Sequence, residues 1–99
     1  MIIEITKYKP VEGLTHEELL QASKNFDRDY CSKCIGLIRR QFVKTDSGYM
    51  DIFTWKSKED VERIQATFMQ DKDALEFARH IDTESLTMSN HELLDSFSG

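Results

Sequence analysis

The first nine residues alternate between apolar and polar side chains. Ile3 and Ile5 fall on one face of the extended chain, while Glu4, Thr6 and Tyr8 fall on the other. A period of two residues is typical of a β-strand that is covered on one face. The sequence therefore predicts that the chain opens with a strand.

A helix is predicted to begin at Thr15. Thr15 and Glu18 have the spacing of a capping box, in which each side chain satisfies a free backbone N–H of the other residue. Apolar residues then recur every three or four positions, as in a helix with one buried face: they are Leu19, Ala22, Phe26, Tyr30 and Cys34. We expect the helix to reach about Ser32 and the segment to end at Gly36.

Residues 35–45 and 49–56 predict a β-hairpin, because both are rich in β-branched and aromatic types and they flank Asp46-Ser47-Gly48. In the expected register Val43 lies opposite Asp51, and Arg39 lies opposite Trp55. One face is then mainly apolar and should pack under helices: Ile38, Phe42, Met50 and Ile52, with Arg40 and Thr54 as exceptions. The other face is polar and aromatic and should line a cavity or a subunit interface: Arg39, Gln41, Val43, Tyr49, Asp51, Phe53 and Trp55.

The rest of the chain predicts two more helices and a last strand. Ser57 should cap a helix whose apolar stripe is Val61, Ile64 and Phe68. Asp71 or Asp73 should cap a third helix, with Leu75, Ala78 and Ile81 on its inner face. Residues 84–91 alternate weakly and are expected to form a strand, and the apolar tail of Leu93, Leu94 and Phe97 is expected to pack on a neighbouring subunit.

This order, β-α-β-β-α-(α)-β, predicts an α+β domain of the ferredoxin-like split βαβ type, with an antiparallel sheet covered by helices on one face. Residues 1–99 fit one such domain. With 39% apolar residues its core should be thin, which favours help from a partner subunit. The net charge of −5 disfavours nucleic acid and anionic membranes as partners, and the apolar runs are too short for a transmembrane helix or a signal peptide. We expect a cytoplasmic protein.

Trp55, at the end of a predicted strand, followed by the helix cap Ser57, resembles the strand-to-helix junction of the dimeric α+β barrel superfamily, in particular the antibiotic biosynthesis monooxygenase group. The resemblance covers nearly the whole chain in element order. It implies a homodimer in which two ferredoxin-like subunits lay their open sheet faces together into a barrel, with a pocket between sheet and helices or inside the barrel.

The resemblance also implies site residues. In the cofactor-independent, quinone-forming members an Asn stands four residues before the Trp, and here that position is Asp51, on the same face of the strand. The amide of Asn can donate a hydrogen bond to a substrate oxygen, whereas an ionised Asp51 can only accept one. The quinone-forming reaction therefore does not follow directly for this chain. In the haem-degrading members a second Trp lies where this chain has Ile64, and the His position is close to His80, so haem degradation is disfavoured.

Asp51 is the main chemical candidate. In an aromatic cavity, desolvation would raise its pKa and Arg39 would lower it, which suits a general base for a phenolic or enolic substrate. We predict Asp51, Trp55 and Arg39 as catalytic residues, acting on an aromatic or polyketide-like small molecule without metal, flavin or other cofactor. Predicted binding residues are Tyr8, Gln41, Tyr49, Phe53, Arg79 and His80.

Plainer interpretations stay open for the same residues. A strand-end Trp is commonly a core or interface residue, and Asp51 can simply face solvent. The chain would then be a dimeric ligand-binding or structural protein with no reaction. Cys31 and Cys34 have the CxxC spacing, but they close a helix, where the helix dipole raises thiol pKa values, so a buried or partly exposed structural pair is favoured over a redox or zinc site.

Overall fold

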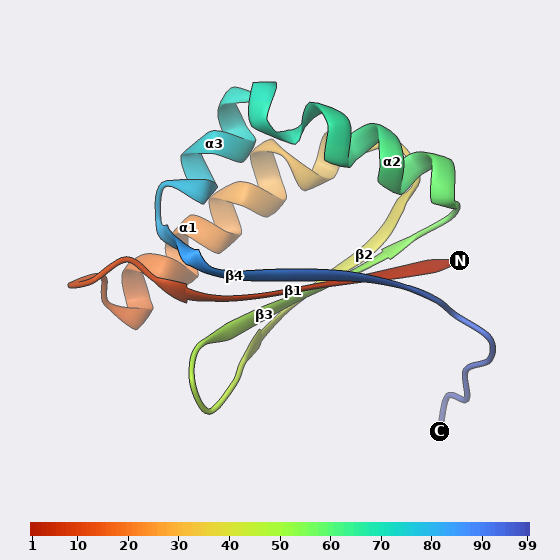
Figure 1. The fold of residues 1–99 in the computed structure, drawn as a ribbon, viewed down its shortest axis with the longest axis horizontal. Coiled ribbons are helices and arrows are strands. Elements are labelled where there is room, and N and C mark those ends of the chain that lie inside the picture. The colour runs from red at the N-terminus through yellow and green to blue at the C-terminus, as the bar shows by residue number, and fades with distance from the viewer.

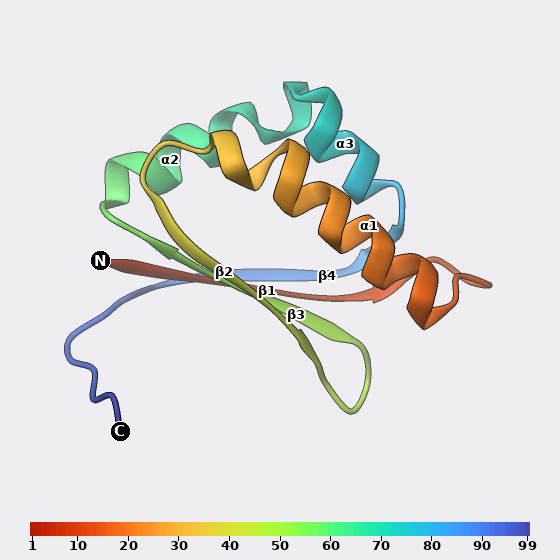
Figure 2. The ribbon, with the colours of Figure 1, turned by 180° about the vertical axis from the view of Figure 1, so that it is seen from behind.

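A computed structural model describes residues 1–99 as one four-stranded antiparallel sheet with helices on one face. Figures 1 and 2 show the helical layer on one side of the sheet and no helix on the other. The strands are β1 (Ile2–Pro10), β2 (Leu37–Lys44), β3 (Tyr49–Trp55) and β4 (Ile81–Glu92), in the order β2-β3-β1-β4. The helices are α1 (His16–Asp29), α2 (Lys58–Thr67) and α3 (Lys72–Ala78), with short 3-10 turns η1 (Cys31–Lys33) and η2 (Phe68–Gln70). The ferredoxin-like prediction is confirmed.

The helix starts follow the predicted caps. Thr15 accepts from the backbone N–H of Glu18, whose carboxylate accepts in turn from the backbone of Thr15. Ser57 accepts from the backbone of Asp60 at the start of α2. Asp71, one of the two residues proposed for α3, accepts from the first backbone N–H groups of that helix. Each cap satisfies donors that a helix start would otherwise leave free.

The hairpin register differs from the prediction by one residue. Asp51 lies opposite Phe42 rather than Val43, and a bulge between Leu37 and Arg39 brings Leu37 opposite Trp55. Because side chains alternate along a strand, a shift of one residue exchanges the faces of β2 relative to β3. Arg40 and Phe42 therefore share the face of Asp51, and the predicted faces were wrong.

The helix-covered face is the one that carries the aromatic and polar side chains of β3. The burial of β3 decides this, because Tyr49, Asp51, Phe53 and Trp55 are all buried. The core is strongly aromatic. It combines residues of β1 and β3 with residues in or next to α1, α2 and α3: Tyr8, Leu19, Ala22, Phe26, Tyr30, Tyr49, Phe53, Trp55, Val61, Ala74 and Phe77. The inner face of α3 is Ala74 and Phe77, whereas Leu75 is 40% exposed, so the predicted inner face of this helix was off by one position.

The opposite face of the sheet has no helix over it. Cross-strand pairing places Ile5 beside Ile52, and Met50 beside Lys7 and Val43, on this open face. These apolar side chains are half-buried, although no other part of the chain covers the sheet here. The exposed tail beyond β4 includes Leu94 and Phe97, which are 88% and 93% exposed.

Candidate functional site

Asp51 lies near the middle of β3 and points from the sheet toward the helices. Its Oδ2 accepts a hydrogen bond of 3.1 Å from the hydroxyl of Tyr8 on β1, and its Oδ1 accepts one of 2.7 Å from Nη2 of Arg40 on β2. The side chains of Arg40 and Asp51 are 2% and 4% exposed. Three neighbouring strands therefore place a buried acid, a buried cation and a buried phenol in contact.

Arg40 is held in place from both the sheet and α1. Its Nη1 donates to Ser23 Oγ at 2.7 Å and to Asp27 Oδ1 at 2.9 Å. The guanidinium carbon also lies 4.9 to 5.2 Å from three phenyl ring centres, those of Phe26, Phe42 and Phe77. Only Nε has no hydrogen-bond partner, although it is fully buried. The arginine is thus a fixed part of the site rather than a mobile surface charge.

The protonation states of this cluster follow from its burial. Desolvation raises the pKa of Asp51 to about 6, against the opposing effects of the Arg40 charge and the Tyr8 hydrogen bond. Burial, reinforced by the charge of Asp51, raises the pKa of Tyr8 well above its ordinary value. At neutral pH, Asp51 is therefore a carboxylate that is readily protonated, and Tyr8 remains a hydrogen-bond donor.

A second buried carboxylate lies further along β1. Glu4 Oε1 accepts from the indole Nε1 of Trp55 at 3.0 Å, and Oε2 accepts from Nε2 of Gln65 at 3.2 Å. Gln65 belongs to α2 and also lies within hydrogen-bond distance of Asn90 and Met88 on β4. Its side chain therefore bridges the helical layer and the edge strand of the sheet.

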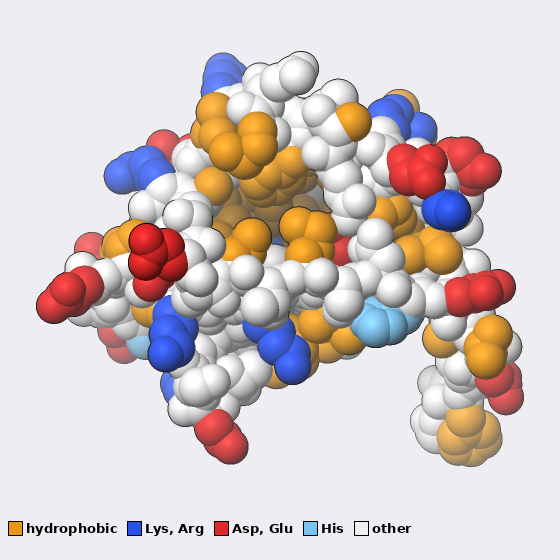
Figure 3. Space-filling model, in the orientation of Figure 1, with side chains coloured by type: hydrophobic (Ala, Val, Ile, Leu, Met, Phe, Trp, Pro, Cys, Tyr) orange, Lys and Arg blue, Asp and Glu red, His pale blue; other side chains and the backbone are white.

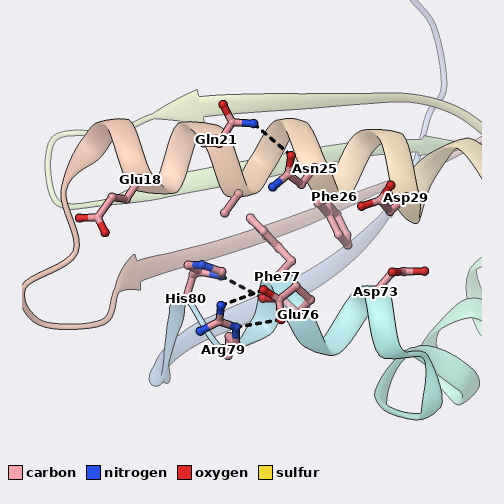
Figure 4. A pocket seen from close by; sticks show the side chains of 11 residues that line it. Glu18, Gln21, Asn25, Phe26, Asp29, Asp73, Glu76, Phe77, Arg79 and His80 are labelled. Carbon is pink, nitrogen blue, oxygen red and sulfur yellow. Dashed lines mark hydrogen bonds and ion pairs between the residues drawn. The ribbon is translucent and has the colours of Figure 1, made fainter.

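Several hollows border the helical layer. The first is the cleft between α1 and α3, a pocket of about 320 Å³ whose apolar walls are Ala22, Phe26 and Phe77. Figure 4 shows Phe26 and Phe77 in this cleft between the polar side chains of the two helices. The rings of Phe26 and Phe77 stack with centroids 4.5 Å apart, and both also contact Arg40. This pair of rings therefore separates the α1–α3 cleft from the Asp51 cluster.

The second hollow lies between the helices and β4. Figure 3 shows it above β4, with hydrophobic side chains gathered around it. Met88 is on the helix-facing side of β4, because it is paired with Thr6 and its sulfur meets Gln65 of α2. It is nevertheless 51% exposed. The helices therefore leave the β4 edge of this face uncovered.

The structure brings together some of the predicted site residues and separates others. Tyr8 contacts Asp51, while Tyr49, Phe53 and Trp55 share its face of the sheet and are buried. Arg39 and Gln41 are exposed on the opposite face, beside Thr54 and Ile52. The predicted effect of Arg39 on Asp51 was wrong, because the one-residue difference in hairpin register puts Arg40, and not Arg39, on the face of Asp51.

Arg79 and His80, which were predicted as binding residues, directly follow α3 and line the α1–α3 cleft. Both side chains contact Glu76 of that helix. Arg79 forms a two-point ion pair with Glu76, and His80 Nδ1 lies 2.9 Å from the carbonyl oxygen of Glu76. Phe26 and Phe77 separate them from Asp51. Their role in binding stays a prediction.

Sequence reasoning missed Arg40, Ser23, Asp27 and Gln65 as members of the site. Arg40 carried a signal, since it was the one charged residue on the strand face that was expected to be apolar. His16, at the start of α1, also has a long-range partner: its Nδ1 lies 2.8 Å from the hydroxyl of Tyr49 and the two rings stack. Nothing in the local pattern of α1 indicates this long-range partner.

Cys31 begins the short turn η1 after α1, and Cys34 directly follows that turn. Burial raises the pKa values of both Cys31 and Cys34, which keeps the thiols protonated at neutral pH. The structure contains no group of three or more His, Cys, Asp and Glu side chains arranged to hold a metal ion. No helix has the length and apolar character that crossing a membrane requires.

No family model and no curated protein matches the chain. Solved structures do match, at low identity. A protein from Nitrosomonas europaea provisionally named an antibiotic biosynthesis monooxygenase has a TM-score of 0.69 and 13% identity, over 96% of this chain and 100% of that one. A mutant of SnoaB, a cofactor-independent oxygenase from Streptomyces nogalater, has a TM-score of 0.64 and 12% identity, over 98% and 94%.

A dimeric protein of unknown function and ferredoxin-like fold from Bacteroides fragilis has a TM-score of 0.61 and 12% identity, over 93% of this chain and 95% of that one. The fold that the resemblance implied is thus shared with proteins of the antibiotic biosynthesis monooxygenase type. At these identities the likeness shows the fold, and the site must support the function.

Proposed function

We propose that this protein is a homodimeric, cofactor-independent monooxygenase-like enzyme that acts on an aromatic or polyketide-like small molecule between the sheet and the helices. The observation that carries the proposal is the buried carboxylate of Asp51, with a pKa raised to about 6 and with Arg40 and Tyr8 fixed on its two oxygens. A base with a pKa near the working pH is suited to proton transfer.

In the proposed reaction Asp51 removes a proton from an acidic C–H or O–H group of the substrate. The substrate anion then gives electrons to O₂, which is the only oxidant. For an activated methylene the sum is R₂CH₂ + O₂ → R₂C=O + H₂O, in which one oxygen atom enters the carbonyl group and the other leaves as water. Arg40 and Tyr8 keep the carboxylate in place, and the surrounding aromatic rings exclude water.

The homodimer is supported by the open face of the sheet. Ile5, Met50 and Ile52 form an apolar surface on the side away from the helices. A contiguous exposed apolar face is typical of an interaction surface. In the proposed dimer the interface and Asp51 lie on opposite faces of one sheet, so that each subunit keeps its own site.

Oxidation of 1,8-dihydroxyanthrone under air, followed by the absorbance of the anthraquinone product, tests the proposal. We expect the wild-type protein to accelerate product formation and Asp51→Asn to lose at least 90% of that rate. Asp46→Asn, the same change in the exposed hairpin loop, is the matched control and should keep the rate. Equal rates for Asp51→Asn and the wild type would remove Asp51 as the base, and binding of the anthrone without turnover would favour the non-catalytic alternative.

A further inference from the structure

Toward β4, the neighbour of Asp51 across the sheet is the small side chain of Thr6. The stacked rings of Phe26 and Phe77 separate Asp51 from the α1–α3 cleft, and Phe42 lies beside it on β2. Strand pairing places Asp51 of β3, Thr6 of β1 and Met88 of β4 side by side, in one row across the sheet. Thr6 is small and half-buried.

The row ends on β4, and Figure 3 shows a hollow above this strand. Two strand spacings, about 10 Å, separate the backbone of Asp51 from that of Met88. One boundary of the row is the bridge from Gln65 to Glu4 and Asn90. The other is Tyr8, whose ring meets the edge of the Phe77 ring at a centroid distance of 6.2 Å.

The charges along this row restrict what it can hold. Glu4 and Asp51 are the buried carboxylates on this side of the sheet, and both oxygens of each carboxylate already accept hydrogen bonds. Arg40, the cation buried beside them, is shared between Asp51 and Asp27. An anionic ligand would therefore enter a buried region without a free counter-charge, which is costly. An uncharged aromatic ring meets apolar and polarizable atoms, including the sulfur of Met88.

We infer that an uncharged aromatic substrate reaches Asp51 from the β4 edge, lying over Met88 and Thr6 between the Gln65 bridge and Tyr8, and not through the cleft between α1 and α3. This inference rests on the proposed function for the role of Asp51. It adds the access route and the charge of the substrate. Met88 and Thr6 are then the residues that determine which ring systems fit.

Two fluorescent probes with the same skeleton test the charge preference. N-phenyl-1-naphthylamine is neutral, and 8-anilinonaphthalene-1-sulfonate is the same molecule with one sulfonate. We expect the neutral probe to bind the wild-type protein at least tenfold more tightly. Equal binding, tighter binding of the sulfonate, or no binding of the neutral probe would overturn the inference.

Two tryptophan substitutions, at the exposed Met88 and the half-buried Asn25, test the route. Met88→Trp fills the hollow at β4, and we expect it to weaken binding of the neutral probe at least tenfold and to raise KM for the anthrone. Asn25 lines the α1–α3 cleft, so Asn25→Trp fills that cleft. We expect this variant to change neither probe binding nor KM, because the inferred route does not pass through the cleft. Thr6→Leu closes the row next to Asp51 and provides a second block. Circular dichroism and thermal unfolding establish that each variant is folded.

The outcomes separate the inference from the proposed function. Loss of binding in Asn25→Trp with retention in Met88→Trp overturns the route. If Asp51→Asn abolishes anthrone oxidation while Met88→Trp and Thr6→Leu leave KM unchanged, the function stands and the route is wrong. If the wild type does not oxidise the anthrone but Met88→Trp abolishes probe binding, the route stands and the monooxygenase assignment is wrong.

Discussion

Arg40 and Asp51 form an ion pair of 2.7 Å in which both side chains are almost completely buried. The pair joins β2 to β3 diagonally, since Arg40 is paired in the sheet with Phe53 and Asp51 with Phe42. Removing two charges from water is costly, and the mutual attraction offsets that cost only while both partners are present. Loss of either side chain therefore leaves the other charge buried without a partner of opposite sign.

Arg40→Met should lower the free energy of unfolding by about 3 to 5 kcal/mol, because it leaves the Asp51 charge buried without its cation. Arg39→Met is the matched control. Arg39 is exposed on the opposite face, so its replacement should change stability by no more than about 0.5 kcal/mol. Urea unfolding of both variants measures the difference. Similar small losses for the two variants would show that the ion pair does not stabilise the fold.

The raised pKa of Asp51 predicts an unusual pH dependence of stability. A carboxyl group with a pKa of about 6 when folded and an ordinary, lower pKa when unfolded binds more protons in the folded state between those two values. Its contribution to stability is therefore present at low pH and is lost as the pH rises toward 6. Burial causes this, because it disfavours the charged form.

Comparison with Asp51→Asn isolates this contribution. The stability of the wild type relative to Asp51→Asn should fall between pH 4.5 and pH 6.5, by urea unfolding at each pH. Asp46→Asn, in the exposed loop, should show no such trend relative to the wild type. A flat profile over this range, with stability lost only below about pH 4, would mean that Arg40 lowers the pKa of Asp51 below its usual value, contrary to the expectation from burial.

Element order and helix starts could be predicted because they depend on local patterns. The capping box of Thr15 and the cap at Ser57 are written in residues three apart, and the alternation of β1 lies within nine residues. The register of the hairpin could not be predicted in the same way. The loop between β2 and β3 has four residues, 45–48, instead of the expected three, so Lys44 pairs with Tyr49 and the faces of β2 are reversed relative to β3.

In the candidate site too, residues with a local signal were predicted and long-range contacts were missed. Asp51 was found because a charge in an apolar strand is conspicuous, and Tyr8 because of its position on β1. Ser23 and Asp27 were missed because their contact with Arg40 depends on the packing of α1 against the sheet. Polar residues on one helix do not reveal which buried cation, thirteen or more positions away in sequence, they will meet.

The open face of the sheet predicts that a charge at its centre will separate the proposed dimer. Ile52 lies on this face beside Ile5 and Gln41. Ile52→Glu would place a carboxylate in an apolar interface, where it has no partner. We expect a dimer for the wild type and a monomer for Ile52→Glu by light scattering at micromolar concentration. Leu75→Glu, on the exposed side of α3, is the control and should remain a dimer. A monomeric wild type contradicts the proposal.

Gly13 and Gly36 offer a matched pair of substitutions, because both have positive φ angles, of 88° and 87°. An added methyl group costs about 1 kcal/mol at either position through backbone conformation alone. At Gly13 nothing lies near the added Cβ, whereas at Gly36 it would overlap the carboxylate of Asp60. That carboxylate accepts from the hydroxyl of Ser57, the cap of α2, and from the guanidinium of Arg63.

Gly36→Ala should therefore cost more than Gly13→Ala, by about 1 kcal/mol, which is the usual contribution of a helix cap. Chemical denaturation of the two variants measures this difference. In an Asp60→Ala background the carboxylate is absent, so the two glycine substitutions should cost the same. A difference that persists in that background would place the strain in the backbone between η1 and β2 rather than at the start of α2.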